Sequence, residues 1–435
     1  MKPPFEWDHL SDQPHVISNK TFKNSLKKQG IPHYVKSFFV ALITLPIVLF
    51  AMLFFRAKKT TLTGADFLGL CVNQDKLPEL APELVAQLGV KKILVRIPLW
   101  DCDNIDKYKA FCQSLGDVDI VFCLLQDREH VTNHAMLTKH IDIVFTALRG
   151  ISCEFQVGNA TNRLKWGCIS VEESLQFFGV VKAYRDAHFK EIKLIGSSVI
   201  DFEPISTVRS VFHLYNAKAD AMAALLYVDR RGSPESTQGW IFDFKHKIRF
   251  VYTAMCLSPK IHNKLYITEI NWPLKDKSGY APAKGDCTVS EDDAAMYLVR
   301  SYLIAWATGQ VDTVFWHQLI APGYGLVDHR EDVRFMPAFY AFKTLNQFLV
   351  SAQLTRYTVQ NHIHSCLFID KPNGIKICIA WSDDPATLAV FNQKWKASTL
   401  YNLYGEVLLP DNITHIASQP LYEVVHADTL HDSSC

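Results

Sequence analysis

Short apolar runs alternate with longer amphipathic stretches along most of the chain from residue 63 to residue 350. The short runs are continuous rather than alternating in polarity, which is typical of strands that are buried on both faces in a parallel sheet. The pattern predicts strands at 66–72, 91–100, 118–126, 153–159, 192–200, 221–229, 264–270 and 311–319.

The stretches between these runs carry helical patterns, and glycine often ends them, as it does at helix C-termini. Strand–helix units repeated over about 285 residues match the size of a closed (β/α)8 barrel. An open doubly wound sheet is the alternative, but such a sheet usually has a glycine-rich phosphate loop after its first strand, and FLGLCVNQ is not one. We therefore predict an α/β fold, a TIM barrel, over residues 63–350.

The pattern changes after residue 350, where short apolar runs are separated by polar turns such as KPNG and SDDP. Such a pattern predicts antiparallel strands joined by tight turns. We expect a small antiparallel β domain, a β-sandwich-like accessory domain, over residues 351–427, followed by a tail over 428–435.

A single apolar segment lies near the N-terminus, where residues 37–55 read SFFVALITLPIVLFAMLFF without a charge. A helix of this length spans about 30 Å, the thickness of the hydrocarbon core of a bilayer. The long polar lead and the lack of an A-x-A site argue against a cleaved signal peptide. We predict a transmembrane helix over 37–55, a polar N-terminal tail over 1–36 and a linker over 56–62.

The membrane orientation rests on two signals that disagree. Slightly more basic residues precede the segment than follow it, which favours a cytoplasmic N-terminus and a main domain facing outside or the periplasm. The 11 cysteines lack a CxxC pair and mostly sit in apolar runs, which is typical of buried small side chains and favours a reducing compartment. We expect a single-pass membrane protein in the outward orientation.

The overall charge is close to neutral, with a formal net charge of +1. A neutral balance does not indicate a nucleic-acid partner, which usually requires a basic excess. His130 and His134 have the helical spacing of a zinc pair, but no third ligand stands beside them, so we expect a solvated helix face. His362 and His364 fall in an alternating strand and are expected to face solvent. We expect no metal, nucleotide or flavin cofactor.

The active site of a (β/α)8 barrel lies at the C-terminal ends of its strands, so polar residues at these ends are the candidates for chemistry. The candidates lie toward the C-terminal ends of the predicted second, fourth, sixth, seventh and eighth strands: Arg96, Asn159, Tyr227, Glu269 and Trp316.

Two of these strand ends carry a specific resemblance. The stretches KLYITEINWP and CEFQVGNATN are similar to the nucleophile and acid/base strands of the retaining (β/α)8 glycoside hydrolases of clan A, the xylosidase- and cellulase-like group, and the resemblance covers about residues 63–427. It implies that Glu269 is the catalytic nucleophile and that four further residues bind the substrate: Arg96, Asn159, Tyr227 and Trp316. Ala160 stands where the clan has its acid/base glutamate.

The vacant acid/base position changes the functional expectation. A retaining glycosidase needs two carboxyls about 5 Å apart, one as nucleophile and one as proton donor. Alanine cannot transfer a proton, and general acid catalysis is typically worth about 10²–10⁴-fold in rate. The residues considered for a displaced acid are Asp201, Glu203, Asp229 and Glu235.

Three functions from different classes remain open. The first is a membrane-anchored glycoside hydrolase that acts on an envelope or surface glycan through Glu269. The second is a catalytically inactive pseudo-glycosidase that binds an oligosaccharide or polysaccharide. The third is a scaffold in a polysaccharide or lipopolysaccharide assembly system, whose protein partners the sequence does not identify.

Overall fold

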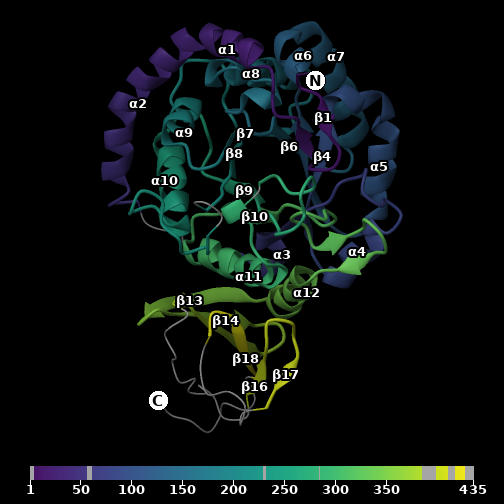
Figure 1. The fold of residues 1–435 in the computed structure, drawn as a ribbon, viewed down its shortest axis with the longest axis vertical. Helices are drawn as coiled ribbons and strands as arrows, with labels where there is room; N and C mark the ends of the chain where they lie inside the picture. Colours follow the sequence, from purple (N-terminus) through teal and green to yellow (C-terminus); the bar gives the residue numbers. More distant parts are fainter. Residues whose placement is uncertain are drawn as a thin grey trace.

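The computed structural model describes residues 4–55, 61–228, 232–283, 285–384, 398–409 and 417–426. A barrel ringed by helices forms the main body, two N-terminal helices run over its top and one flank, and a β-sheet lies beyond α11 and α12 at the opposite end (Figure 1). The barrel determines where the candidate site lies, and the N-terminal segment packs at the mouth of the barrel beside that site.

The predicted TIM barrel is confirmed. Its parallel strands close into a ring in the order β10-β3-β4-β5-β6-β7-β8-β9. Their bounds are β3 (Leu68–Cys71), β4 (Lys92–Pro98), β5 (Asp119–Leu125), β6 (Glu154–Val157), β7 (Lys193–Ile200), β8 (Ala221–Leu225), β9 (Leu265–Ile270) and β10 (Thr313–Trp316). Each strand lies within the run that the hydrophobic pattern predicted for it.

The ring closes where β10 pairs in parallel with β3, with Phe315 opposite Gly69. Both strands are completely buried, because helices cover the outside of the ring and side chains fill its interior. Tyr302 of α11 (Glu291–Ala307) supports this seam, since its hydroxyl donates to the Gly69 carbonyl at 2.5 Å and accepts from the Trp316 amide at 3.1 Å.

The helices of the outer ring begin at residues that suit a helix N-terminus. Side-chain oxygens of N-cap residues such as Asp127, Ser170 and Asp243 accept backbone N–H groups that have no partner within the helix. The remaining helices are α3 (Gly64–Phe67), α4 (Ala81–Leu88), α5 (Ile105–Ser114), α6 (Arg128–Thr132), α7 (His134–Leu148), α8 (Val171–His188), α9 (Pro204–Val211), α10 (Phe244–Leu257) and α12 (Pro337–Leu349), with 3-10 turns at Leu99–Asn104, Leu164–Trp166 and Gly285–Cys287.

The C-terminal β domain is confirmed as antiparallel. In the described residues its strands form one sheet in the order β13-β14-β15-β18-β16-β17, whereas the pattern predicted a sandwich. The bounds are β13 (Gln353–Gln360), β14 (Ile363–Asp370), β15 (Ile375–Ser382), β16 (Thr399–Tyr401), β17 (Val407–Leu408) and β18 (Leu421–His426), and a further two-stranded pair, β11 (Val327–Asp328) and β12 (Arg334–Phe335), lies next to the barrel. Aromatic contacts such as Trp306–Phe368 and Phe348–Tyr422 join the sheet to α11 and α12, which serve as its second layer.

The histidine predictions were wrong for one member of each pair, whereas His134 and His362 are exposed as predicted. His364 is buried rather than solvent-facing, because its ring stacks on Trp381 and bonds to Tyr357 and Asp383. His130 is also buried: its Nδ1 lies 2.7 Å from Asp127 and its Nε2 lies 2.8 Å from His140 Nδ1. Within the described ranges, no group of three potential metal ligands occurs, and the cysteines are free thiols.

The apolar segment forms α2 (Ile31–Ala51). This helix begins six residues before the predicted start at residue 37 and ends four residues before the predicted end at residue 55. By length and composition α2 could cross a membrane. It lies along α9, with further contacts to α10 and α8, and buries only a narrow stripe, Ser37, Ala41 and Val48. The large apolar side chains that it leaves exposed are Ile31, Tyr34, Val35, Phe38, Phe39, Leu42, Ile43, Ile47, Leu49 and Phe50.

Residues 4–30 are folded against the barrel, although the sequence predicted only a polar tail over 1–36. β1 (Trp7–Asp8) and β2 (Gln13–Pro14) pair as a hairpin, called the N-terminal hairpin below, and α1 (Lys20–Gln29) leads into α2. Further along the chain, after the C-terminal end of α2, the Thr61 carbonyl accepts a hydrogen bond from the Gln353 side chain. Both ends of α2 therefore connect to segments that lie on the same globular body.

Replacing Gly69 by alanine should destabilise the ring at its seam. A Cβ at this position would lie 2.6 Å from the Phe315 ring and 2.8 Å from the Val314 carbonyl oxygen. Forced overpacking of this kind costs about 1–3 kcal/mol, and the loss should appear as a lower urea midpoint of unfolding. Gly150→Ala is the matched control, because a Cβ there has nothing within 4 Å. An equal midpoint for both variants would contradict the tight seam.

Candidate active site

Glu269 lies at the C-terminal end of β9, where the register with β8 shifts between Ala224 and Leu225. The Leu226 amide donates to the Glu269 carbonyl at 3.1 Å, which anchors the backbone where the strand ends. The side chain is partly exposed and lines a cavity at the barrel mouth. The structure thus places this carboxylate where the catalytic groups of barrel enzymes stand.

Two neutral donors hold the two oxygens of the Glu269 carboxylate. The Tyr227 hydroxyl donates to Oε1, and the Asn159 side-chain amide donates to Oε2 at 3.5 Å. Burial pushes the pKa of Glu269 up, but the Arg96 guanidinium and these two hydrogen bonds oppose this effect, and the pKa is below its usual value. The carboxylate is therefore ionised at neutral pH.

The positive charge next to Glu269 belongs to Arg96, which lies in β4, just past the middle of the strand. Burial alone would lower the pKa of Arg96, but the neighbouring anionic groups, Glu269 foremost, raise it above its usual value. His317 stays neutral near pH 7, because burial lowers its pKa to about 3. Arg96 Nη1 lies 3.4 Å from His317 Nε2, so a buried guanidinium and a neutral imidazole together face the carboxylate.

A paired amide contact fixes the loop that carries Asn159. Gln126 Nε2 donates to the Asn159 carbonyl at 2.8 Å, and the Asn159 amide donates back to Gln126 Oε1 at 2.9 Å. The next residue, Ala160, is completely buried and has a left-handed backbone with φ of 47°. A glutamate installed at this position would need both new space and a strained backbone.

The cavity that Glu269 faces has a volume of about 180 Å³. Besides Glu269, two carboxylic acids line it, Asp12 from the N-terminal hairpin and Asp201 from the end of β7; the other lining residues used below are Arg96, Arg163, Lys165, Trp166, Tyr227, Asn271, His317 and Tyr324. The remaining residues considered for a displaced acid lie elsewhere. Glu203 bonds to Arg163 and Asn162, Glu235 bonds to Arg300 and Trp381, and Asp229 lies outside the described residues.

Trp316 does not line this cavity. It is fully buried, and its ring stacks on Trp272 with the centroids 5.8 Å apart. The residue that reaches the cavity from this strand end is the following one, His317. The other four candidates come together: Arg96, Tyr227 and Glu269 line the cavity, and Asn159 bonds to the Glu269 carboxylate.

The N-terminal hairpin covers the barrel mouth. Asp12 is 3% exposed, and its carboxylate accepts from Gln318 Nε2 at 2.6 Å and pairs with Lys76 at 3.0 Å. Arg96 Nη1 donates to the Asp12 carbonyl at 3.1 Å. Burial raises the pKa of Asp12 above its usual value despite the nearby Lys76. The first dozen residues of the chain therefore contribute directly to the candidate site.

Trp7 anchors this hairpin. Its ring lies 5.3 Å from Trp100 and 5.7 Å from Trp166, measured between centroids, and the Arg96 guanidinium lies 5.5 Å from its ring centre. Neither the hairpin nor His317 was among the predicted site residues. A signal in the sequence was the large aromatic residue Trp7 within an otherwise polar segment, since such a side chain is usually buried against other parts of a protein.

The chain resembles solved glycoside hydrolases in fold. A family 39 glycoside hydrolase from Bacteroides cellulosilyticus WH2 matches with a TM-score of 0.61 at 14% identity, over 82% of this chain and 80% of that one. An α-L-arabinofuranosidase from Thermotoga maritima matches at 0.59 and 10%, over 85% and 98%. A family 39 β-xylosidase from Caulobacter crescentus matches at 0.56 and 13%, over 85% and 98%.

No known family profile matches the sequence, and no curated protein matches it. The structural neighbours share a barrel with this chain at identities of 10–14%, so they define its architecture. The class of protein that the fold defines is the glycoside hydrolase-like (β/α)8 barrel with a C-terminal β domain, in agreement with the resemblance carried by the strand motifs.

Trp7→Ala should release the hairpin from the barrel mouth. Aromatic pairs contribute about 0.5–1.5 kcal/mol each beyond area burial, so the loss of two pairs should speed hydrogen exchange over residues 5–16 by roughly tenfold or more. Trp240→Ala is the control, because Trp240 is 96% exposed. Unchanged exchange in Trp7→Ala, measured by mass spectrometry, would show that this ring does not hold the hairpin.

Proposed function

We propose that the barrel mouth binds a glycan and that Glu269 acts there as the nucleophile of a retaining glycoside hydrolase. The observation that carries this proposal is the ionised Glu269 carboxylate, held by Tyr227, Asn159 and Arg96 beside a cavity at the strand ends. A carboxylate that is oriented by two donors and faces a cavity suits attack on a sugar carbon better than a purely structural role.

The chemistry assigned to Glu269 has two steps. Its Oε attacks the anomeric carbon, a glycosyl ester bond forms, and the bond to the leaving oxygen breaks. Water then cleaves the ester, which restores the carboxylate and releases the sugar. Arg96 and Tyr227 keep the nucleophile charged before attack, and Asn159, as the resemblance implies, also contacts the sugar. Trp316, buried behind His317, would shape the floor of the site without touching the ligand directly.

The proton donor differs from the usual one, since Ala160 has no acidic group. Asp12 and Asp201 are the carboxylic acids that share the cavity with Glu269. Asp201 is bonded to Arg163, whereas burial raises the pKa of Asp12. We infer that substrates with good leaving groups react fastest, because they need the least help from an acid.

Glycan binding without cleavage is the second candidate function, and the buried Ala160 at the acid/base position favours it. In that case the same contacts recognise an oligosaccharide or polysaccharide. A scaffold role in glycan assembly would depend on the outer surface of the barrel, and Glu269 would then have no catalytic or binding role. A covalent trapping experiment separates the nucleophile from both alternatives.

We also propose that α2 attaches the protein to a membrane and that the ligand is an envelope or surface glycan. The exposed apolar side chains of α2 support attachment. The predicted single-pass arrangement with an outward barrel would place the N-terminal residues and the barrel on opposite sides of the membrane. It therefore requires the N-terminal hairpin to leave the barrel mouth.

Glu269→Gln should abolish covalent trapping. Full-length protein incubated with a panel of 2,4-dinitrophenyl 2-deoxy-2-fluoroglycosides should gain the mass of one glycosyl group, because the good leaving group removes the need for an acid. Peptide mapping should place the added mass on Glu269. Asp201→Asn is the matched carboxyl-to-amide control and should still be trapped. A panel that labels nothing would favour binding without cleavage.

The trapping rate should be independent of pH from neutral down to below the usual glutamate pKa of about 4.5, because the pKa of Glu269 is lowered. The nucleophile loses its charge only when the pH falls through that lowered value. Tyr227→Phe removes a hydrogen bond to the charged form, so the acid limb of the profile should move upward by roughly one pH unit. An unmoved limb in Tyr227→Phe would argue against Glu269 as the titrating group.

A further inference from the structure

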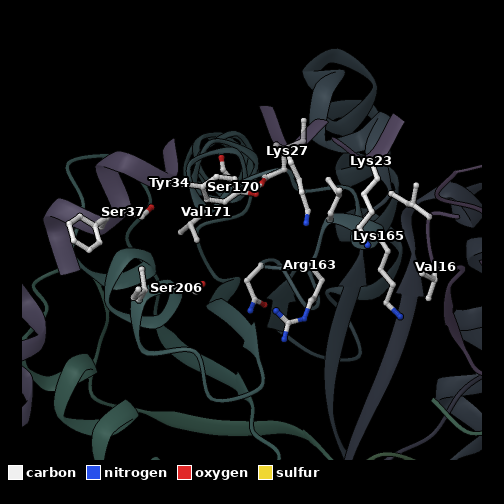
Figure 2. Close-up of a pocket in the computed structure, with 16 residues that line it drawn as sticks. Val16, Lys23, Lys27, Tyr34, Ser37, Arg163, Lys165, Ser170, Val171 and Ser206 are labelled. Carbon is white, nitrogen blue, oxygen red and sulfur yellow. Dashed lines mark hydrogen bonds between the residues drawn. The ribbon is translucent and has the colours of Figure 1, made fainter. Parts of the chain in front are cut away.

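A second and larger cavity lies between the barrel and the N-terminal helices. Its volume is about 670 Å³, and residues from α1, the first turns of α2, the loop after β6 and the start of α9 line it. Figure 2 shows that the basic groups of Lys23, Lys27, Lys165 and Arg163 gather on one side of this cavity, whereas Ser37, Val171 and Ser206 lie on the other.

Ion pairs with carboxylates compensate only part of the charge on the basic side. Arg163 is bonded to Asp201 and Glu203. For Lys23, Lys27 and Lys165, in contrast, no ion pair with a carboxylate forms within the described part of the chain, and no acidic residue lines the cavity there. Lys165 donates to the neutral Gln13 side chain at 2.5 Å, and its burial lowers its pKa to about 8. An anion in the cavity would complement these lysines.

The opposite side of the cavity combines serine hydroxyls with apolar side chains and continues onto α2. The apolar residues that line the cavity as a whole are Val16, which lies on the lysine side, and Ile17, Phe38, Leu164, Ile169, Val171 and Ile205 (Figure 2). Phe38 is also one of the large exposed apolar residues of α2. The Tyr34 hydroxyl donates to the Ile169 carbonyl at 2.7 Å and holds the first turns of α2 on the barrel. A ligand that fits both sides must therefore carry an anionic head and an apolar tail.

The exposed apolar face of α2 lies next to this cavity. The N-terminal hairpin and the barrel contact each other through Asp12 and Arg96, so the segments before and after α2 lie on the same side of any membrane. In this arrangement α2 meets lipid through its exposed apolar face rather than by crossing the bilayer. Basic pockets at such a surface are typical binding sites for anionic lipid head groups.

We propose that this cavity binds the phosphate head group of an anionic membrane lipid, with the acyl chains leaving along the exposed face of α2. Lys23, Lys27 and Lys165 contact the phosphate, and Phe38 and Ile205 contact the first methylene groups. A soluble phosphate would leave the apolar wall without a partner, which favours the lipid as the source. The site does not depend on the role of Glu269.

The test measures lipid binding to full-length protein in a neutral detergent by native mass spectrometry. Dioctanoyl phosphatidic acid supplies both parts of the ligand, dioctanoylglycerol lacks the phosphate, and inorganic phosphate lacks the chains. Phosphatidic acid should bind at least about tenfold more tightly than either probe. The double variant Lys23→Gln/Lys27→Gln should weaken its binding about tenfold or more, because each basic group near a lipid phosphate contributes on this scale.

The control variant is Lys107→Gln/Lys109→Gln, which removes two exposed lysines from α5 on the opposite side of the barrel (Figure 1). This variant and Glu269→Gln should bind the lipid like the unaltered protein. Equal weakening by both lysine pairs would show general charge attraction and overturn the proposal. Binding of inorganic phosphate as tight as that of the lipid would also overturn the proposal. Equally tight binding of dioctanoylglycerol would overturn it as well.

Discussion

The pairing of β10 with β3 is the constraint on which the rest of the structure depends. An open parallel sheet would leave two edges and spread its strand ends along a line, whereas closure brings the C-terminal ends of all strands into one small ring. Arg96, Asn159, Tyr227 and Glu269 are far apart in the sequence, yet they meet at this ring. The charge of Glu269 is maintained because these donors converge from separate strands.

The barrel mouth differs from an open enzyme cleft in two ways that are connected. Position 160 has no carboxylic acid, and the N-terminal hairpin brings a different one, Asp12, into the same cavity. The hairpin also lines this cavity of about 180 Å³ and accepts a hydrogen bond from Arg96 through its own backbone. Access to Glu269 is therefore coupled to the position of a segment that connects, through α1, to the apolar helix α2.

Most of the barrel could be predicted from the sequence, because strands buried on both faces leave continuous apolar runs. Each observed strand falls within its predicted run, and Glu269 and Tyr227 lie where the strand-end argument placed them. Trp316 shows the limit of that argument. Residues near a strand end alternate between the interior of the ring and its surroundings, and here His317 rather than Trp316 lines the cavity. A motif position does not specify which of two neighbours faces the ligand.

The sequence by itself determined the period of the elements, the carboxylate after the seventh barrel strand and the apolar character of α2, since each depends on residues close together in the chain. Only the tertiary structure decided where the first 30 residues go. Their contacts, such as Asp12 with Gln318 and Trp7 with Trp166, join residues that are more than 150 positions apart, and no local pattern encodes such partners. The burial of Ala160 and the basic cavity beside α2 were decided in the same way, because both arise where separate elements pack against each other.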